Sequence, residues 1–255
     1  MPADALAGAT SRRRMIVTLP TPDPELVEEL VIGNRILYHQ KIVDAFGHLS
    51  VRDNQDPTKY LMSRHLAPGL VTAGDVVRLD LDSVPVHDIG KRYYSERFIH
   101  GEIYKARPEV KAVVHCHAPQ LIPFGATKVP LQPIYHMSGF LGAGVPIFEI
   151  REAGGITDML VRTPALGRAL AAALGDKPVI LMRGHGATMV GTSIKHVVYR
   201  AIYAALNAAL QMEALRLGEP MFLSREEAVL AAERNDKALE RAWALWEAEA
   251  PISGM

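Results

Sequence analysis

Three features are missing or almost missing from this sequence: a pair of cysteines, an excess of one charge and a long apolar run. Cys116 is the only cysteine among 255 residues, so the chain cannot form an internal disulfide. The 28 Lys and Arg residues equal the 28 Asp and Glu residues, which leaves no basic excess for nucleic acid or an anionic membrane. No apolar run approaches the roughly 20 residues that span a bilayer.

The N-terminus also lacks the pattern of an export signal. Arg12, Arg13 and Arg14 are followed by a proline-rich stretch where a signal peptide needs an apolar core. Together with the single cysteine, this predicts a cytoplasmic protein. Residues 1–22 are small, basic and then proline-rich, which indicates a flexible arm, and residues 23–255 are expected to form one domain.

Helical and strand patterns are mixed along the chain. Apolar residues at helical spacing predict helices over residues 25–46, 96–107, 158–175, 193–218 and 226–246. The helical stretch 158–175 is either one helix or two pieces divided around Pro164. Shorter apolar or alternating runs predict strands over residues 59–63, 75–83, 109–117 and 145–150, and a strand, tight turn and strand over 178–191. Ser95 is the expected N-cap of the second helix, and residues 47–53 are expected to be a turn. This mixture predicts an α/β protein, a three-layer α/β/α sandwich around a central sheet.

Two histidines stand one residue apart at the end of the predicted strand 109–117. Successive side chains of a strand point to opposite faces, so His115 and His117 share one face while Cys116 points to the other. Cys116 is expected to be a small buried residue of the core. Two neighbouring imidazoles are difficult to bury unless something holds both, and a metal ion is the obvious candidate.

A histidine in a tight turn supplies a third candidate ligand. His185 lies between Gly184 and Gly186, which tolerate the sharp turn that aims its ring. Alone it is more often an ordinary loop histidine, but three histidines with an open fourth position are typical of a catalytic metal site. Glu96 lies near the start of a predicted helix, where a glutamate is usually only a favourable dipole contact. His100, on the same helix face, is interpreted as a core or supporting residue.

The motifs taken together resemble the class II aldolase/adducin family. SERFIHGEIYKARPEVKAVVHCHAP is followed later by RGHGATMVG, and GHLSVRD fits the glycine-containing loop near the family's N-terminus. The resemblance covers roughly residues 25–215 and implies a class II aldolase-like fold with a mostly antiparallel sheet. It also implies one divalent ion per chain, zinc or manganese, bound by His115, His117 and His185, with Glu96 as the acid/base.

The loops that bind phosphate in the best-known aldolases of this family differ here. The first loop reads GHLS, with His48 at the position of an asparagine, and the second reads LMSRHLAP, with Arg64 where a small residue is expected. A pocket with His48, Ser63 and Arg64 still attracts anions, and a guanidinium matches a carboxylate in a two-point contact. The alternative for Arg64 is an ordinary surface charge. Tyr135 and His136 are expected to lie close to the metal cleft and contact substrate.

These stretches resemble a branch of the family that decarboxylates hydroxylated aromatic acids, including hydroxypyridine and catechol-type dicarboxylates. The leading interpretation is therefore a metal-dependent carbon–carbon lyase that decarboxylates a hydroxylated aromatic or heteroaromatic (di)carboxylate through a metal-stabilised enolate. The alternative is a class II aldolase that cleaves a hydroxy-ketone or sugar phosphate, because the same site serves both reactions. A third possibility is an adducin-like binding protein that has lost catalysis.

The long predicted helix over residues 193–218 indicates self-association. Members of the resembled family are typically tetramers with the active site between neighbouring subunits, so we expect a homo-oligomer, most simply a tetramer. The C-terminal segment that contains Trp243 and Trp246 is expected to cover the site of a neighbouring subunit. The apolar residues lie on more than one side of this helix and include Val197, Ile202, Leu206, Leu210 and Leu215.

Overall fold

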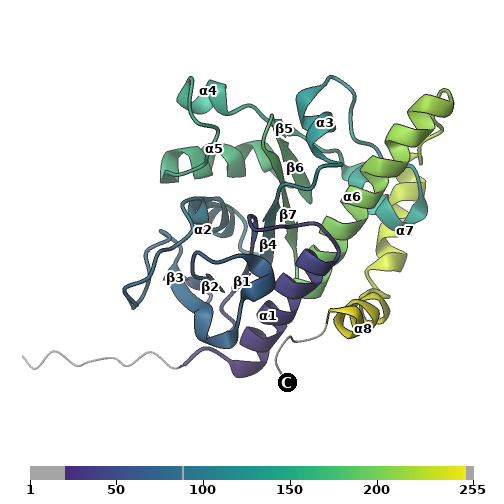
Figure 1. Ribbon diagram of the computed structural model, residues 1–255. Coiled ribbons are helices and arrows are strands. Elements are labelled where there is room, and N and C mark those ends of the chain that lie inside the picture. The colour runs from purple at the N-terminus through teal and green to yellow at the C-terminus, as the bar shows by residue number, and fades with distance from the viewer. Residues whose placement is uncertain (1–20, 88, 251–255) are drawn as a thin grey trace, which may run out of the picture.

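A seven-stranded sheet forms the middle layer of the computed structural model, which describes residues 21–87 and 89–250 (Figure 1). The strands are β1 (His48–Arg52), β2 (Lys59–Ser63), β3 (Val76–Asp80), β4 (Ala112–Cys116), β5 (Ile147–Phe148), β6 (Val179–Met182) and β7 (Gly186–Gly191). Their order in the sheet is β3-β2-β1-β4-β7-β6-β5, and all neighbours pair antiparallel except β5 and β6. This confirms the predicted α/β class and the mostly antiparallel sheet.

Helices cover both faces of the sheet and give the three layers that the sequence predicted (Figure 1). The α-helices are α1 (Pro24–His39), α2 (Arg97–Ala106), α3 (Ile122–Ala126), α4 (Ile150–Gly154), α5 (Pro164–Leu174), α6 (Ile194–Leu217), α7 (Arg225–Asn235) and α8 (Leu239–Glu249). Short 3₁₀ helices are η1 (Pro68–Leu70), η2 (Ala73–Asp75) and η3 (His136–Ala143). One hydrophobic core lies between the sheet and α1, α6 and α8, and a second lies between the sheet and α2 and α5.

The central strands separate the core from the site by simple alternation. In β1, Leu49 belongs to the core under α1 and α6, while the preceding residue, His48, contacts His100 of α2 on the opposite face of the sheet. In β4, Cys116 is fully buried in the same core as Leu49, as predicted, and His115 points to the α2 side. Because successive side chains point to opposite faces, β1 and β4 each contribute one face to the core under α1 and α6 and place a histidine on the other.

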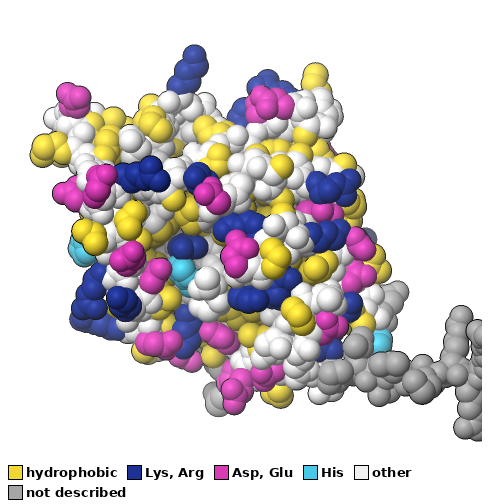
Figure 2. Space-filling view, turned by 180° about the vertical axis from the view of Figure 1, so that it is seen from behind, with side chains coloured by type: hydrophobic (Ala, Val, Ile, Leu, Met, Phe, Trp, Pro, Cys, Tyr) yellow, Lys and Arg dark blue, Asp and Glu magenta, His cyan; other side chains and the backbone are white. Residues whose placement is uncertain are grey.

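Charged side chains of both signs are spread over the surface. On the face shown in Figure 2, Lys and Arg side chains are interspersed with Asp and Glu side chains, in agreement with a formal net charge of zero. Within residues 21–87 and 89–250, no helix is both long enough and apolar enough to cross a bilayer. The predicted N-terminal arm lies outside the described residues except for Thr21 and Pro22.

Two predictions near the N-terminus are wrong. The helix expected over residues 25–46 ends at His39, because Gln40 caps it and Lys41 adopts a positive φ of 58°, which a helix does not accommodate. Residues 47–53, expected to be a turn, contain β1. The alternation in HLSVR is a strand pattern, but every residue of β1 is buried, so its polar half faces other protein groups and not solvent.

Boundaries beside the site also differ from the prediction. Ser95 does not cap α2, since Glu96 occupies the N-cap position and its side chain makes no capping bond. Residues 158–163 are not helical, and α5 begins at Pro164, whose fixed φ suits the first helical turn. Both differences have the same origin, because Glu96 and the 158–163 segment contact each other at the site described below.

The C-terminal helix predicted over residues 226–246 is two helices. One ends at Asn235 and the next begins at Leu239. Trp243 and Trp246 are buried in the core shared by α1, α6 and α8 of their own chain. The two indoles therefore stabilise the fold of their own chain, and the covering of a neighbouring subunit's site by the C-terminal segment stays a prediction.

Candidate metal centre and adjoining cavity

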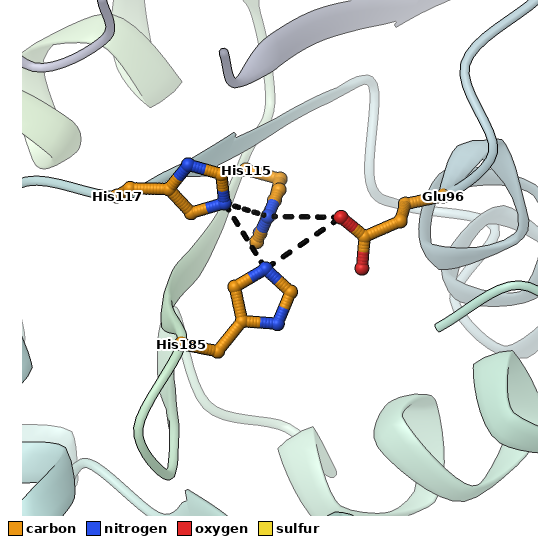
Figure 3. A group of neighbouring side chains, drawn as sticks. All are labelled: Glu96, His115, His117 and His185. Carbon is orange, nitrogen blue, oxygen red and sulfur yellow. Dashed lines mark hydrogen bonds and ion pairs between the residues drawn. The ribbon is translucent and has the colours of Figure 1, made fainter. Parts of the chain in front are cut away.

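Four side chains from separate parts of the fold point toward one another (Figure 3). Glu96 lies at the start of α2, His115 in β4, His117 just beyond β4, and His185 in the turn between β6 and β7. The Nε2 atom of His117 lies 3.1 Å from that of His115 and 3.0 Å from that of His185. Oε2 of Glu96 lies 3.7 Å and 3.6 Å from the same two nitrogens of His115 and His185. The structure thus brings together the set that the sequence predicted.

Hydrogen bonds on the far side of two rings fix which nitrogen is free to bind a metal. His185 Nδ1 lies 2.9 Å from the carbonyl oxygen of Met159, so Nδ1 carries the hydrogen and Nε2 keeps its lone pair. His115 Nδ1 lies 3.3 Å from the Thr188 hydroxyl, which donates its own hydrogen to the Met182 sulfur. Thr188 therefore accepts from His115, and the Nε2 lone pair of His115 also points into the cluster.

The spacing of these nitrogens fits a single divalent ion. Bare lone pairs held close together repel, whereas zinc–nitrogen bonds of about 2.0–2.1 Å let one ion reach all three rings. Burial lowers the pKa of His115 and of His117, so both rings stay neutral, the state in which imidazole binds a metal. The cluster therefore has the donor atoms that a metal site requires, with the rings of His115 and His117 neutral and Nε2 of His115 and His185 free to bind.

A glycine allows the turn that carries His185 to approach β4. A Cβ atom placed on Gly186 would lie 2.1 Å from the carbonyl oxygen of Cys116, well inside contact distance. Gly184 adopts a positive φ of 62°, which favours glycine. The two glycines thus do what the sequence predicted, and they bring His185 within reach of His117.

Glu96 is held in place by a backbone group. Its Oε1 atom accepts a hydrogen bond of 2.8 Å from the N–H of Val161, which leaves Oε2 facing the histidines. Only 6% of Glu96 is exposed, and this burial raises the pKa of its carboxyl group, against a smaller opposing effect of His185. A carboxyl group whose pKa is raised by burial holds a proton more readily than an exposed one, which suits an acid/base group.

A cavity of about 510 Å³ opens beside the cluster. Its wall combines polar groups such as Glu96, His48 and His117 with the apolar side chains of Phe46 and Leu70. Pockets for small molecules typically have volumes of about 300–1,000 Å³. The arrangement suits a small molecule with charged groups beside the histidines and an apolar part between Phe46 and Leu70.

Residues 28–212 match the family described as Class II Aldolase and Adducin N-terminal domain. The chain belongs to this family. A solved structure described as an aldolase II superfamily protein from Pseudomonas syringae has a TM-score of 0.75 to this fold and 26% sequence identity. That similarity covers 91% of this chain and 95% of the other, which confirms the class II aldolase-like fold over most of the molecule.

Two members of the family with named activities are decarboxylases. Decarboxylase tropJ of Talaromyces stipitatus is 38% identical over 263 residues, which cover 94% of this chain and 98% of that protein. The 3,4-dihydroxyphthalate decarboxylase of Arthrobacter keyseri is 28% identical over 206 residues, covering 75% of this chain and 79% of the other. The chain is therefore most similar in these comparisons to decarboxylases of the class II aldolase family.

The predicted substrate contacts are only partly at the cavity of this family member. His48 lines the cavity. Ser63 is buried, and its hydroxyl lies 3.1 Å from that of Tyr94, which does line the cavity. Arg64 pairs with Asp75 through Nε at 2.7 Å and is not among the lining residues.

Tyr135 and His136 lie elsewhere in the same chain. The Tyr135 ring packs 6.4 Å from that of Tyr203 in α6, and the His136 carbonyl accepts a hydrogen bond from Asn235 at the end of α7. Neither residue lines the cavity beside Glu96. Within one chain, the structure does not bring this pair to the metal cluster, and their contact with substrate stays a prediction.

Other groups at the site were not found from the sequence. His65 and Tyr94 line the cavity, although the sequence analysis gave neither a role. His65 follows Arg64 in the loop that replaces a phosphate-binding loop of the family, and this position was an available signal. Met159 and Val161 act through their backbone groups, which are the same in every residue, so no sequence signal could have identified them.

Proposed function

We propose that this protein is a metal-dependent decarboxylase of a hydroxylated aromatic or heteroaromatic carboxylate. The observation that carries the proposal is the cluster of Glu96 with three histidines, open to a cavity, in a chain 38% identical to a named decarboxylase along nearly its whole length. An adducin-like binding role is disfavoured, since a binding protein has no need of convergent, neutral metal ligands beside a cavity.

Decarboxylation of an aryl carboxylate needs a place for the electron pair that carbon dioxide leaves behind. A hydroxyl group ortho to the carboxylate provides it, because in the ketone tautomer the pair can move onto that oxygen. His115, His117 and His185 would hold a divalent ion, which would supply the positive charge that stabilises the developing oxyanion. We infer zinc or manganese, since imidazoles suit zinc and an oxygen-rich remainder suits manganese.

Glu96 is the group placed to move the proton. Forming the ketone tautomer places a proton on the ring carbon that bears the carboxylate. When carbon dioxide leaves, the electron pair moves onto the ketone oxygen and that proton remains as the ring hydrogen. The Val161 N–H fixes one carboxylate oxygen of Glu96 and leaves the other directed at the histidine cluster. Because its pKa is raised, the Glu96 carboxyl takes up a proton more readily than an exposed one, and the hydrogen bond from Val161 keeps it in position.

Arg64 and His48 are the proposed anchors for the substrate's anionic groups, with Ser63 supporting them through Tyr94. In the described part of the chain, Arg64 uses Nε for Asp75, and neither Nη group has a protein partner. The side chain is 30% exposed, and the next residue, His65, lines the cavity. The guanidinium can therefore bind a carboxylate at the cavity's edge while it remains tied to Asp75.

Replacing Arg64 by alanine should weaken substrate binding and leave the metal in place. Loss of a charge-assisted contact typically costs about 1.5–3 kcal/mol, so we expect KM to rise about 10- to 100-fold with little change in kcat. Steady-state kinetics together with metal analysis would measure both. Arg92→Ala is a control from the nearby 85–95 segment. An unchanged KM in Arg64→Ala would mean that Arg64 is an ordinary surface charge with no role in substrate binding.

We further propose a cytoplasmic homotetramer. Leu206 and Leu210 on α6 are 48% and 46% exposed, and Leu230 on α7 is 67% exposed, so apolar side chains remain uncovered on the helical layer. Uncovered apolar residues on neighbouring helices are typical of a surface that packs against another subunit. Sedimentation at micromolar protein should show a tetramer, and a monomer under these conditions would contradict the proposal.

The reaction itself is tested by the products. Zinc- or manganese-loaded protein should release carbon dioxide from at least one member of a panel of ortho-hydroxy aromatic and pyridine carboxylates, including 3,4-dihydroxyphthalate. Hydroxy-ketone phosphates are incubated in parallel and assayed for aldehyde. Aldehyde from a phosphate without carbon dioxide from any aromatic acid would overturn the proposal in favour of the aldolase alternative.

A further inference from the structure

A chain of hydrogen-bonded polar groups runs from the cavity into the interior of the protein. His48 Nδ1 lies 2.6 Å from His100 Nε2, and His100 Nδ1 lies 2.6 Å from the Ser50 hydroxyl. The Ser50 hydroxyl lies 2.8 Å from that of Tyr104. His48 lines the cavity, whereas the other three side chains are at most 1% exposed. The proposed reaction, as described so far, makes no use of the buried part of this chain.

The central ring of the chain is neutral. Burial lowers the pKa of His100 to about 3, and no carboxylate is among its hydrogen-bond partners. A neutral imidazole has one N–H and one lone pair, so a ring that accepts on one side must donate on the other. The direction of every hydrogen bond from Ser50 to His48 is therefore set at the buried end of the chain.

Tyr104 sets that direction. Among the described residues, Ser50 is the only hydrogen-bond partner of the Tyr104 hydroxyl, so the phenol can place its hydrogen only on Ser50. If Ser50 donated instead, the Tyr104 hydrogen would be buried without an acceptor, which native structures avoid. Ser50 then donates to His100 Nδ1, its one remaining partner, and His100 donates from Nε2 to His48 Nδ1.

His48 consequently carries its hydrogen on Nε2, the nitrogen that the chain leaves free. A hydrogen on His48 Nδ1 would face the N–H of His100, so the hydrogen-bond chain excludes both the opposite tautomer and the doubly protonated ring. Its ring centroid is 5.1 Å from that of His115, and His48 lines the cavity, so the ring lies beside the metal cluster. The opposite tautomer would present a lone pair to the cavity and repel an anionic oxygen.

We propose that Tyr104, Ser50 and His100 are positioning residues that lock His48 as a hydrogen-bond donor to an oxygen of the substrate's carboxylate or hydroxyl group. Because its orientation is fixed in advance, such a donor does not have to reorganise during the reaction when it binds an oxygen that carries or develops negative charge. The inference rests on the proposed function for the identity of the ligand. The tautomer itself follows from the hydrogen-bond chain alone.

The tautomer can be observed directly. Zinc-loaded protein labelled with ¹⁵N in histidine is examined by long-range proton–nitrogen NMR, and His48→Asn identifies the signals of His48 by their loss. We expect a pyrrole-type nitrogen at Nε2 and a pyridine-type nitrogen at Nδ1. A pyrrole-type nitrogen at Nδ1 with a pyridine-type nitrogen at Nε2 would overturn the inference, whatever the enzyme's activity.

The effect on binding is measured with 2-hydroxybenzoate as the probe. Ser50→Ala removes the donor to His100, so the tautomer of His48 is no longer fixed and the probe should bind roughly 3- to 10-fold more weakly, the value of one hydrogen bond. Zinc content should not change, and Ser50→Thr, which keeps the hydroxyl, should restore binding. Tyr60→Phe is the control, because it deletes another buried hydroxyl on the same face of the sheet that bonds to Ser83 instead.

The possible failures are distinguishable. Unchanged binding in Ser50→Ala, or equal weakening in Tyr60→Phe, would contradict a positioning role for Ser50. If the probe binds as expected but no aromatic acid loses carbon dioxide, the hydrogen-bond chain stands and the proposed function fails. If carbon dioxide is released while His48 carries its hydrogen on Nδ1, the function stands and this inference fails.

Discussion

Replacing His185 by alanine should remove the metal ion and abolish carbon dioxide release. The ring of His185 is one of three whose Nε2 atoms converge, and the Met159 carbonyl fixes the tautomer that leaves Nε2 free to bind the metal. A site reduced to two imidazoles and a carboxylate binds a divalent ion far more weakly. We expect His115→Ala to behave in the same way.

Metal content per chain and turnover are the two quantities to measure for these variants. His87→Ala is the matched control, because His87 is exposed and outside the cluster, and it should keep both properties. Circular dichroism of each variant separates loss of metal from loss of fold. Full metal occupancy in His185→Ala would show that the ligand assignment is wrong.

Glu96→Gln should keep its metal and lose turnover. The amide is nearly the same shape as the carboxyl and can still accept the hydrogen bond from Val161, so the histidine cluster is undisturbed. It cannot give or take a proton at neutral pH, and loss of an acid/base group typically lowers kcat by about 100-fold or more. KM should change little, because the substrate's anionic groups are bound elsewhere.

A second buried carboxylate provides the control for this variant. Glu102 lies on the same helix, is 3% exposed and pairs with Lys105, but it does not line the cavity. Glu102→Gln should lower stability more than turnover, whereas Glu96→Gln should do the reverse. A Glu96→Gln enzyme that turns over within a few-fold of the original would remove Glu96 from the proton-transfer role.

The sequence predicted the metal cluster well because its signals are local and simple. Alternation along a strand places His115 and His117 on one face and Cys116 on the other, and the structure has this arrangement. The glycines around His185 had marked it as a third candidate ligand, and the resemblance to the class II aldolases then gave Glu96 its role. The structure brings both into the same cluster, from the β6–β7 turn and from the start of α2. The comparisons confirm both the family and the relationship to its decarboxylases.

The groups that support the cluster were much harder to predict. Residues 158–163 have helical spacing of apolar side chains, yet two of their backbone groups hold Glu96 and His185. Local propensity predicted a helix here. The segment is not helical, and in its observed form its backbone groups bond to the buried carboxyl of Glu96 and to the ring of His185. Similarly, β1 was missed because His48 and Ser50 are polar, although their face of the strand is fully buried against α2.

Contacts between loops that are far apart in the chain could not be predicted from the sequence either. Arg64 was expected in the cavity from its place in a substituted loop, but its pairing with Asp75 depends on how η2 folds back beside it. Tyr135 and His136 were expected near the metal, and the buried amides of α6, which bond to the 130–134 backbone, draw this segment against the helical layer instead. Such contacts join residues far apart in the chain and leave no periodic pattern.

The central claim is that one divalent ion, held by three histidines, makes this protein a decarboxylase. It is tested most directly by stripping the metal with a chelator and restoring zinc or manganese stepwise while carbon dioxide release from an ortho-hydroxy aromatic carboxylate is measured. The account predicts no release from the stripped protein, then a rise that reaches its plateau at one ion per chain. Carbon dioxide release that persists at full strength after the metal has been removed would contradict it.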